Sequence, residues 1–183
     1  MSEQPVVRRA AVFFDRDGVI NEDLGYVWRP DQFRFLPGVP EALRWLNRHG
    51  WLAIVVTNQS GIGRGYYTEE DFLRLTRWID QRLAELGAHL DATYYCPHHP
   101  TEALPPYRVV CQCRKPAPGM ILRAIAEWNI DPQRSLLVGN SQRDLQAAAA
   151  AGIKGVLFQG GNLLECVLQA SRQPTIDTAP PQP

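Results

Sequence analysis

The stretch that most constrains the fold is residues 11–21, where a short apolar run precedes two aspartates and a glycine. A run this short, aromatic and bounded by glycine is typical of a buried strand rather than a helix. Asp15 and Asp17 then emerge together at the carboxyl end of that strand, where ligands bind in open α/β sheets. Two neighbouring carboxylates in a half-buried crevice repel each other unless a cation or a retained proton offsets their charge. Because Mg²⁺ prefers oxygen ligands, the pair indicates a magnesium site; a plain strand end with an Asp-Gly turn is the alternative.

The composition is that of one globular domain without a charge bias. Of 183 residues, 45% are hydrophobic, and 19 Lys and Arg balance 19 Asp and Glu. This balance gives no basis for binding nucleic acid or an anionic membrane surface. No apolar run approaches the roughly 18 residues that span a bilayer, and residues 1–9 do not resemble a secretory signal. We therefore expect a cytoplasmic protein whose four cysteines are not in disulfides. We also expect a monomer whose partner is a small molecule rather than nucleic acid or a membrane.

Strands alternate with helices along the rest of the chain. Strands are expected at 51–56, 92–95, 135–138 and 153–158. Helices are expected at 37–50, 68–87 and 116–128, and a further alanine-rich helix follows Asp144 and ends at 151–152. Because the strands are apolar throughout, the pattern predicts an α/β fold whose parallel sheet is covered by helices on both faces. Residues 22–36 are expected to form a flap over the strand end. We assign residues 1–171 to a single domain and predict a disordered tail at 172–183.

A proline-rich loop, residues 96–113, carries a cluster of metal-ligating side chains. Cys96, His98, Cys111 and Cys113 are a full tetrahedral set for Zn²⁺, and each C-x-H or C-x-C pair can chelate from one turn. His99 competes with His98, but His98 matches the one-residue gap of the second pair. Such a loop cannot bury enough apolar surface to order itself, so a metal has a structural purpose. Since protein side chains fill all four positions, the predicted zinc is structural rather than catalytic.

The strand ends together offer groups suited to phosphoryl transfer. Besides the two aspartates, they carry Thr57-Asn58, Arg114-Lys115 and the pair Asn140 and Asp144. Acids for a cation, with a hydroxyl and a lysine for an anion, fit a reaction catalysed by positioning and charge stabilisation. Asp15 can attack phosphorus and form an aspartyl-phosphate. Asp17 can protonate the leaving oxygen and then take a proton from water.

These motifs resemble those of haloacid-dehalogenase-superfamily phosphatases, and more narrowly the heptose 1,7-bisphosphate 7-phosphatases and the related histidinol-phosphate phosphatases. The resemblance covers Phe13 to about Phe158. It is carried by Asp15-Arg16-Asp17-Gly18, Gly25-Tyr26-Val27, Thr57-Asn58-Gln59-Ser60-Gly61, Cys96-Pro97-His98-His99-Pro100, Cys111-Gln112-Cys113-Arg114-Lys115-Pro116 and Val138-Gly139. The run Gly61-Ile62-Gly63-Arg64-Gly65 and the longer cysteine loop favour the heptose branch.

The resemblance implies a Rossmann-like sheet without a separate cap domain and assigns roles to particular residues. It implies that Asp15 is the nucleophile and Asp17 the general acid and base. Mg²⁺ would bind the Asp15 carboxylate, the Asp17 carbonyl and Asn140. Thr57 and Lys115 would hold the phosphoryl group. The implied substrate-binding residues are Asp23, Leu24, Gly25, Tyr26, Thr57, Asn58, Gln59, Ser60, Arg114 and Lys115.

One position departs from the family pattern. The family has Gly-Asp-Lys after the fourth strand, whereas this chain has Gly139-Asn140-Ser141. An amide oxygen still coordinates a hard cation but brings no charge, so the affinity for magnesium should fall. Asp144 is a candidate to compensate, because it lies four residues after Asn140, on the same side of the start of the following helix. Two hypotheses follow, an active sugar-bisphosphate phosphatase and a catalytically weakened homologue that mainly binds sugar phosphates.

Overall fold

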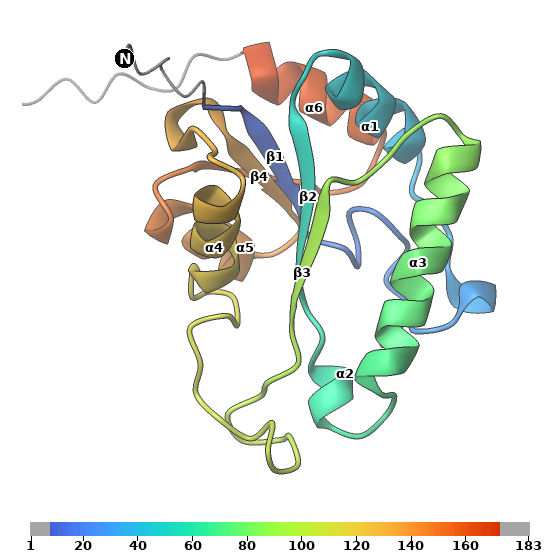
Figure 1. Cartoon of the computed structure of the whole chain (residues 1–183), viewed down its shortest axis with the longest axis vertical. Helices are drawn as coiled ribbons and strands as arrows, with labels where there is room; N and C mark the ends of the chain where they lie inside the picture. The colour runs from blue at the N-terminus through green and yellow to red at the C-terminus, as the bar shows by residue number, and fades with distance from the viewer. Residues whose placement is uncertain (1–7, 173–183) are drawn as a thin grey trace, which may run out of the picture.

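A five-stranded sheet forms the centre of the molecule. The structure is a computed structural model that describes residues 8–172 (Figure 1). The strands are β1 (Ala11–Phe14), β2 (Leu52–Asn58), β3 (Ala92–Cys96), β4 (Leu136–Gly139) and β5 (Lys154–Leu157). They lie in the order β3-β2-β1-β4-β5, and every neighbouring pair is parallel. The chain order therefore reverses between β1 and β4, and a crevice opens at such a switch point beyond the carboxyl ends of the strands.

Helices cover both faces of this sheet, as the sequence predicts (Figure 1). The helices are α1 (Val39–Arg48), α2 (Ser60–Gly63), α3 (Glu69–Glu85), α4 (Gly119–Glu127), α5 (Gln142–Ala150) and α6 (Leu163–Arg172), with short 3-10 turns η1 (Pro30–Gln32) and η2 (Pro132–Arg134). Apolar residues of α1, α3 and α6 pack on one face, and those of α4 and α5 pack on the other. A separate cap domain is not found among residues 8–172, and the α/β fold is confirmed.

Strand β1 shows how the sequence builds the two layers. Val12 and Phe14 point to the α1, α3 and α6 side, and Ala11 and Phe13 point to the α4 and α5 side. Because successive side chains of a strand face opposite ways, a strand buried on both faces has to be apolar at every position. All four residues are fully buried, and burial of each large one contributes roughly 1.5–3 kcal/mol. The edge strands β3 and β5 are less completely buried, which fits their place at the sheet margins.

Several element boundaries differ from the predicted ones. Strand β2 continues through Thr57 and Asn58, and α4 begins at Gly119 rather than at residue 116. The late start of α4 has two local causes. The Gly119 amide donates to the Gln112 carbonyl at 2.8 Å instead of to a helical partner. Pro118 disfavours the helical conformation at residue 117, which comes directly before it. Helices α2 and α6 were not predicted. Arg172 ends α6, and the remainder of the predicted tail, 173–183, lies outside the described residues.

The flap, residues 22–36, leaves the end of β1 and returns to α1. Its base is closed by a bridge between Asn21 and Phe35, and its middle is held by the Arg16 guanidinium, which donates to the Val27 carbonyl at 2.6 Å. Gly25 and Tyr26 both adopt positive φ, which turns the flap back toward the sheet. The flap thus stands over the carboxyl end of β1, as predicted.

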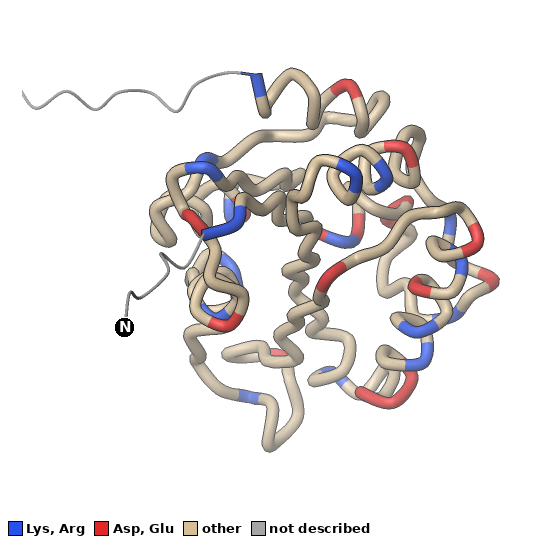
Figure 2. Tube along the Cα trace, turned by 45° about the horizontal axis from the view of Figure 1, so that its top comes forward, with Lys and Arg blue, Asp and Glu red and all other residues tan. Residues whose placement is uncertain are grey.

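Charged residues of both signs are mixed over the helices and loops (Figure 2). This mixing is in keeping with the balanced composition of 19 Lys and Arg and 19 Asp and Glu. Within residues 8–172, no helix combines the length and the apolar character needed to cross a membrane.

Candidate active site

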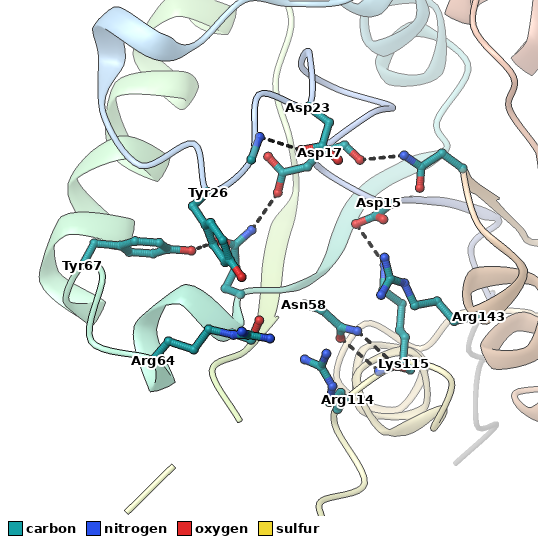
Figure 3. A pocket seen from close by; sticks show the side chains of 14 residues that line it. Asp15, Asp17, Asp23, Tyr26, Asn58, Arg64, Tyr67, Arg114, Lys115 and Arg143 are labelled. Carbon is teal, nitrogen blue, oxygen red and sulfur yellow. Dashed lines mark hydrogen bonds and ion pairs between the residues drawn. The ribbon is translucent and has the colours of Figure 1, made fainter. Parts of the chain in front are cut away.

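A cavity of about 330 Å³ lies beyond the carboxyl ends of the strands. Its size is at the lower end of the range typical of small-molecule sites. The lining side chains come from the β1 end, the flap, residues 58–67 at and after the β2 end, the segment after the cysteines, the β4 end and the first turn of α5 (Figure 3). They are Asp15, Asp17, Asp23, Gly25, Tyr26, Asn58, Gln59, Ser60, Arg64, Tyr67, Arg114, Lys115, Asn140 and Arg143.

Asp15 lies at the floor of this cavity with a lysine beside it. Only 8% of Asp15 is exposed, and one of its carboxylate oxygens lies 2.9 Å from the Lys115 ammonium nitrogen. Burial raises the pKa of Asp15 above its ordinary value, although the charge of Lys115 opposes the shift. The desolvated oxygen has a high affinity for a positive or electron-poor partner, which is the property that a nucleophile toward phosphorus needs.

Lys115 is held between two carboxylates. Its side chain is 1% exposed, and its ammonium nitrogen lies 2.8 Å from a carboxylate oxygen of Asp144 and donates to the Val56 carbonyl at 2.8 Å. Asp144 is fully buried and accepts hydrogen bonds from the Ser141 amide at 3.0 Å and hydroxyl at 2.6 Å. Burial opposes the ionisation of Asp144, yet Lys115 and Ser141 hold the pKa of its carboxyl below the ordinary value. Asp144 therefore pairs with the lysine and does not line the cavity as a replacement magnesium ligand.

We expect Lys115→Met to lower the free energy of unfolding by roughly 3–5 kcal/mol, because two buried carboxylates lose their shared cation. For a chain of this size the change corresponds to a fall in Tm of about 10 °C. Calorimetry at neutral pH without added metal measures it. The double variant Lys115→Met/Asp144→Asn carries one buried charge fewer and should recover part of the loss. A double variant no more stable than the single one would contradict this account of the pair.

Asp17 is oriented by three donors. Its carboxylate accepts from Arg16 at 2.9 Å, from the Asn21 amide at 3.0 Å and from the Gln59 amide at 3.0 Å. Gln59 in turn accepts from the Tyr67 hydroxyl at 2.5 Å, so its amide nitrogen faces Asp17. Because two donors come from the loop that carries Asp17 and the third comes from the segment after β2, the carboxylate has a fixed direction at the cavity wall.

Asn140 lies after β4, directly across the crevice from the β1 end. Its side-chain amide nitrogen donates to the Asp17 backbone carbonyl at 3.1 Å. Gly18 makes this approach possible, because a Cβ there would lie 1.9 Å from that nitrogen. The structure therefore places Asn140 beside the Asp17 carbonyl, in the same cavity as the Asp15 carboxylate, and the resemblance assigns both of these groups to Mg²⁺.

The structure brings most of the sequence-predicted site residues to one cavity, but not all of them. Thr57 is 1% exposed and its hydroxyl accepts from Gln59, so it lies behind the cavity wall. Leu24 is 62% exposed on the flap and does not line the cavity. Three lining residues were not predicted, namely Arg64, Tyr67 and Arg143. The glycine-rich run around Arg64 was visible in the sequence, whereas nothing local singled out the other two.

Three arginines, Arg64, Arg114 and Arg143, also line the cavity (Figure 3). Arg64 forms an ion pair with Glu102, and Arg114 donates to the His98 carbonyl at 3.1 Å. Burial lowers the pKa of Arg114, and the charges of Arg143 and Arg64 act in the same direction. This crowding of like charges favours an anionic ligand in the cavity.

The four predicted zinc ligands come together at the base of the cysteine loop. The sulfurs of Cys96, Cys111 and Cys113 and a ring nitrogen of His98 all lie within 4.8 Å of one another. Ligand atoms around a tetrahedral zinc are about 3.8 Å apart, so the set fits the ion. Burial raises the pKa of the Cys96 thiol, so its thiolate needs a positive partner such as zinc. His99 instead accepts from the Glu102 amide at 3.0 Å, which decides between the two histidines in favour of His98.

Comparisons with known proteins agree with this geometry. The sequence pattern of the haloacid dehalogenase-like hydrolases matches residues 8–152. A Pasteurella multocida protein named D-glycero-beta-D-manno-heptose-1,7-bisphosphate 7-phosphatase is 52% identical over 150 residues, which are 82% of this chain and 81% of that protein. A Vibrio cholerae protein of the same name is 46% identical over 173 residues, which are 90% of this chain and 93% of the relative.

A solved structure leads to the same conclusion. The D,D-heptose 1,7-bisphosphate phosphatase from B. bronchiseptica, complexed with magnesium and phosphate, has a TM-score of 0.75 and 36% identity. The similarity covers 87% of this chain and 86% of that one. The fold, the arrangement of acids and these relatives together show that the chain belongs to the haloacid dehalogenase-like hydrolase family.

Proposed function

We propose that this protein is a magnesium-dependent phosphatase that removes the 7-phosphate of D-glycero-D-manno-heptose 1,7-bisphosphate. The observation that carries the proposal is the buried pair of Asp15 and Lys115, 2.9 Å apart, at the floor of a cavity that Asp17 also lines. The substrate is suggested by the names of relatives that are identical to this chain at about half of the aligned positions.

The side chains support a two-step displacement. In the first step a carboxylate oxygen of Asp15 attacks phosphorus, the bond from phosphorus to the sugar oxygen breaks, and Asp17 gives that oxygen a proton. In the second step water attacks the phosphorus of the aspartyl-phosphate and gives its proton to Asp17. The Asp15–phosphorus bond then breaks and inorganic phosphate leaves. Lys115, already beside Asp15, offsets negative charge on the transferring group in both steps.

The residues at the switch point fit a hard divalent cation. The Asp15 carboxylate, the Asp17 carbonyl and the Asn140 amide oxygen would hold Mg²⁺, provided that the amide turns its oxygen rather than its nitrogen toward the site. When bound, the ion would supply positive charge against the oxygens of the transferring phosphoryl group. Because Asn140 brings no charge of its own, the proposed site binds Mg²⁺ more weakly than a site with a second carboxylate.

We expect Asn140→Asp to strengthen Mg²⁺ binding by about tenfold or more, because a carboxylate replaces a neutral ligand. Without metal the same variant should melt at a lower temperature, since the new carboxylate loses the hydrogen bond to the Asp17 carbonyl and repels it. Titration calorimetry with magnesium chloride and melting curves with and without magnesium measure both effects.

The matched control is Gln142→Glu, which adds the same charge at an exposed position two residues away. It should change the Mg²⁺ affinity by less than about twofold, because it offers no ligand at the switch point. An equal gain in the two variants would mean that Asn140 acts through general charge and not as a ligand.

The proposal also covers the zinc site, the residues that contact the sugar phosphate, the cellular location and the oligomeric state. Zinc on Cys96, His98, Cys111 and Cys113 is structural, and Asp23, Tyr26 and the segment 58–60 contact the sugar phosphate together with Arg114. We also propose a cytoplasmic, monomeric enzyme without nucleic-acid or membrane partners. A histidinol-phosphate substrate is the alternative within the same reaction class.

A second candidate function is favoured by one contact. The Asn140 amide donates to the carbonyl that the metal would need, which is the arrangement expected of a catalytically weakened protein that binds sugar phosphates. The test is phosphate release from the heptose bisphosphate, other sugar phosphates and histidinol phosphate across a magnesium titration. Phosphorus NMR identifies which phosphate remains.

Rapid release of the 7-phosphate at millimolar magnesium supports the proposed enzyme. Binding with negligible turnover at saturating magnesium, restored in Asn140→Asp, would instead establish the weakened homologue. Preferred turnover of histidinol phosphate would replace the proposed substrate.

A further inference from the structure

Arg143 differs from the other two arginines of the cavity wall in how it is paired. Arg64 has a carboxylate partner in Glu102, and Arg114 is tied to the His98 carbonyl. Arg143 donates only from Nε, to the Ser141 hydroxyl at 3.2 Å. Among residues 8–172 it forms no ion pair, so the two terminal nitrogens of its guanidinium remain available to a ligand. A guanidinium in this state is suited to bidentate contact with a phosphate.

The position of Arg143 is not explained by the stability of its own helix. It occupies the first turn of α5, where the partial positive charge of the helix N-terminus opposes a cation. The neighbouring Asp144 does not pair with it, because the carboxylate of Asp144 is taken by Lys115 and Ser141. An anion from outside the chain would relieve this unfavourable placement.

Ser141 fixes Arg143 relative to the phosphoryl site. The Ser141 hydroxyl donates to Asp144 at 2.6 Å and accepts from Arg143 Nε. Asp144 in turn holds Lys115, which lies beside Asp15. Arg143 is therefore linked by short polar contacts to the centre of the reaction, but it is exposed, whereas Lys115 is buried at the floor. Both cations line the same cavity, the lysine from a buried position and the arginine from an exposed one.

We infer that Arg143 binds the second phosphate of the substrate, the one that is not transferred, and so makes the enzyme prefer a bisphosphate to a monophosphate. The inference rests on the proposed function for the identity of the sugar. Lys115 and the Asp15 oxygen engage the reacting phosphoryl group at the floor. A second phosphate on the same sugar would then reach the outer wall, where Arg143 and Arg114 supply positive charge.

The test compares two substrates, D-glycero-D-manno-heptose 1,7-bisphosphate and the corresponding 7-phosphate. Arg143→Ala should raise the KM for the bisphosphate about tenfold, the effect of one charge-assisted contact to phosphate. Its kcat on the bisphosphate and its KM for the monophosphate should change by less than about twofold. Arg143→Lys should restore part of the affinity, and Arg77→Ala, which removes an exposed arginine of α3, should affect neither substrate. An equal loss on both substrates, or none on either, overturns the inference.

A binding experiment separates this inference from the proposed activity. In an Asp15→Asn background, titration calorimetry measures the affinity for the two sugar phosphates with and without Arg143→Ala. A loss of about tenfold for the bisphosphate alone supports the role of Arg143 even if the unmodified enzyme releases no phosphate. If the unmodified enzyme does release phosphate and both affinities are unchanged, the role of Arg143 is rejected and the proposed function stands.

Discussion

Replacement of Asp15 by asparagine is expected to lower kcat by at least about a thousandfold, because no carboxylate oxygen remains to attack phosphorus. The variant should still fold, since asparagine has nearly the same shape. Burial raises the pKa of Asp15, so its carboxylate is ionised at a cost in the folded protein. The Tm of the variant should therefore equal or exceed that of the unmodified protein, as is common when a functional charge is removed. Phosphate release and calorimetry on the same preparation measure the two effects.

The control for this variant is Asp31→Asn, which removes an exposed acid from the η1 turn of the flap. It should leave kcat within about twofold of the original, because surface substitutions away from the site have small effects. A second test uses beryllofluoride, which mimics a phosphoryl group and should be found bonded to an Asp15 carboxylate oxygen in a crystal. Substantial turnover by Asp15→Asn, or a mimic bound elsewhere, would remove Asp15 as the nucleophile.

Loss of the zinc site should have the second largest effect. We expect Cys113→Ser to lower the Tm by at least about 10 °C and kcat/KM by about a hundredfold, because a structural zinc supplies much of the order of its loop. The loop has few buried apolar residues of its own, yet it presents two cavity residues. Arg114 is anchored on the His98 carbonyl, and Lys115 follows the last ligand by two residues. Zinc content, calorimetry and phosphate release measure the outcome.

The matched control is Cys166→Ser, since Cys166 lies on α6 and outside the metal cluster. It should keep one zinc per chain and the original kinetic constants. If Cys113→Ser retains the original Tm and KM, the four side chains do not hold a metal that the active site depends on.

Local residue patterns were sufficient to predict much of this fold. The apolar strands, the helix cap at Thr68 and the acids at the end of β1 are each set by a few neighbouring residues. The zinc ligands were recognisable because two chelating pairs, each with a one-residue gap, flank a loop rich in proline. Such signals survive in the sequence because they depend on spacing over a turn or a strand rather than on distant contacts.

The sequence pattern was less informative where the role of a residue depends on which side chains of other segments pack against it. Thr57 and Leu24 belong to motifs that face the site in part, but packing buries the first behind Gln59 and turns the second to solvent. Asp144 was a candidate metal ligand from its position in the sequence. In the structure it is the counterion of Lys115, because the segment after the cysteine loop brings that lysine to the end of β4.

By itself, the sequence determined the type of elements, the acid pair and the zinc ligands, because these follow from local spacing and from side-chain chemistry. Only the tertiary structure decided the strand order, which sets β1 beside β4 and brings Asn140 to the Asp17 carbonyl. It also decided that Arg143 lines the cavity with a hydrogen bond to Ser141 but no ion pair among the described residues. The physical reason is that periodicity reports which side of an element is buried. The neighbours of a loop at the sheet edge depend instead on how all the layers pack together.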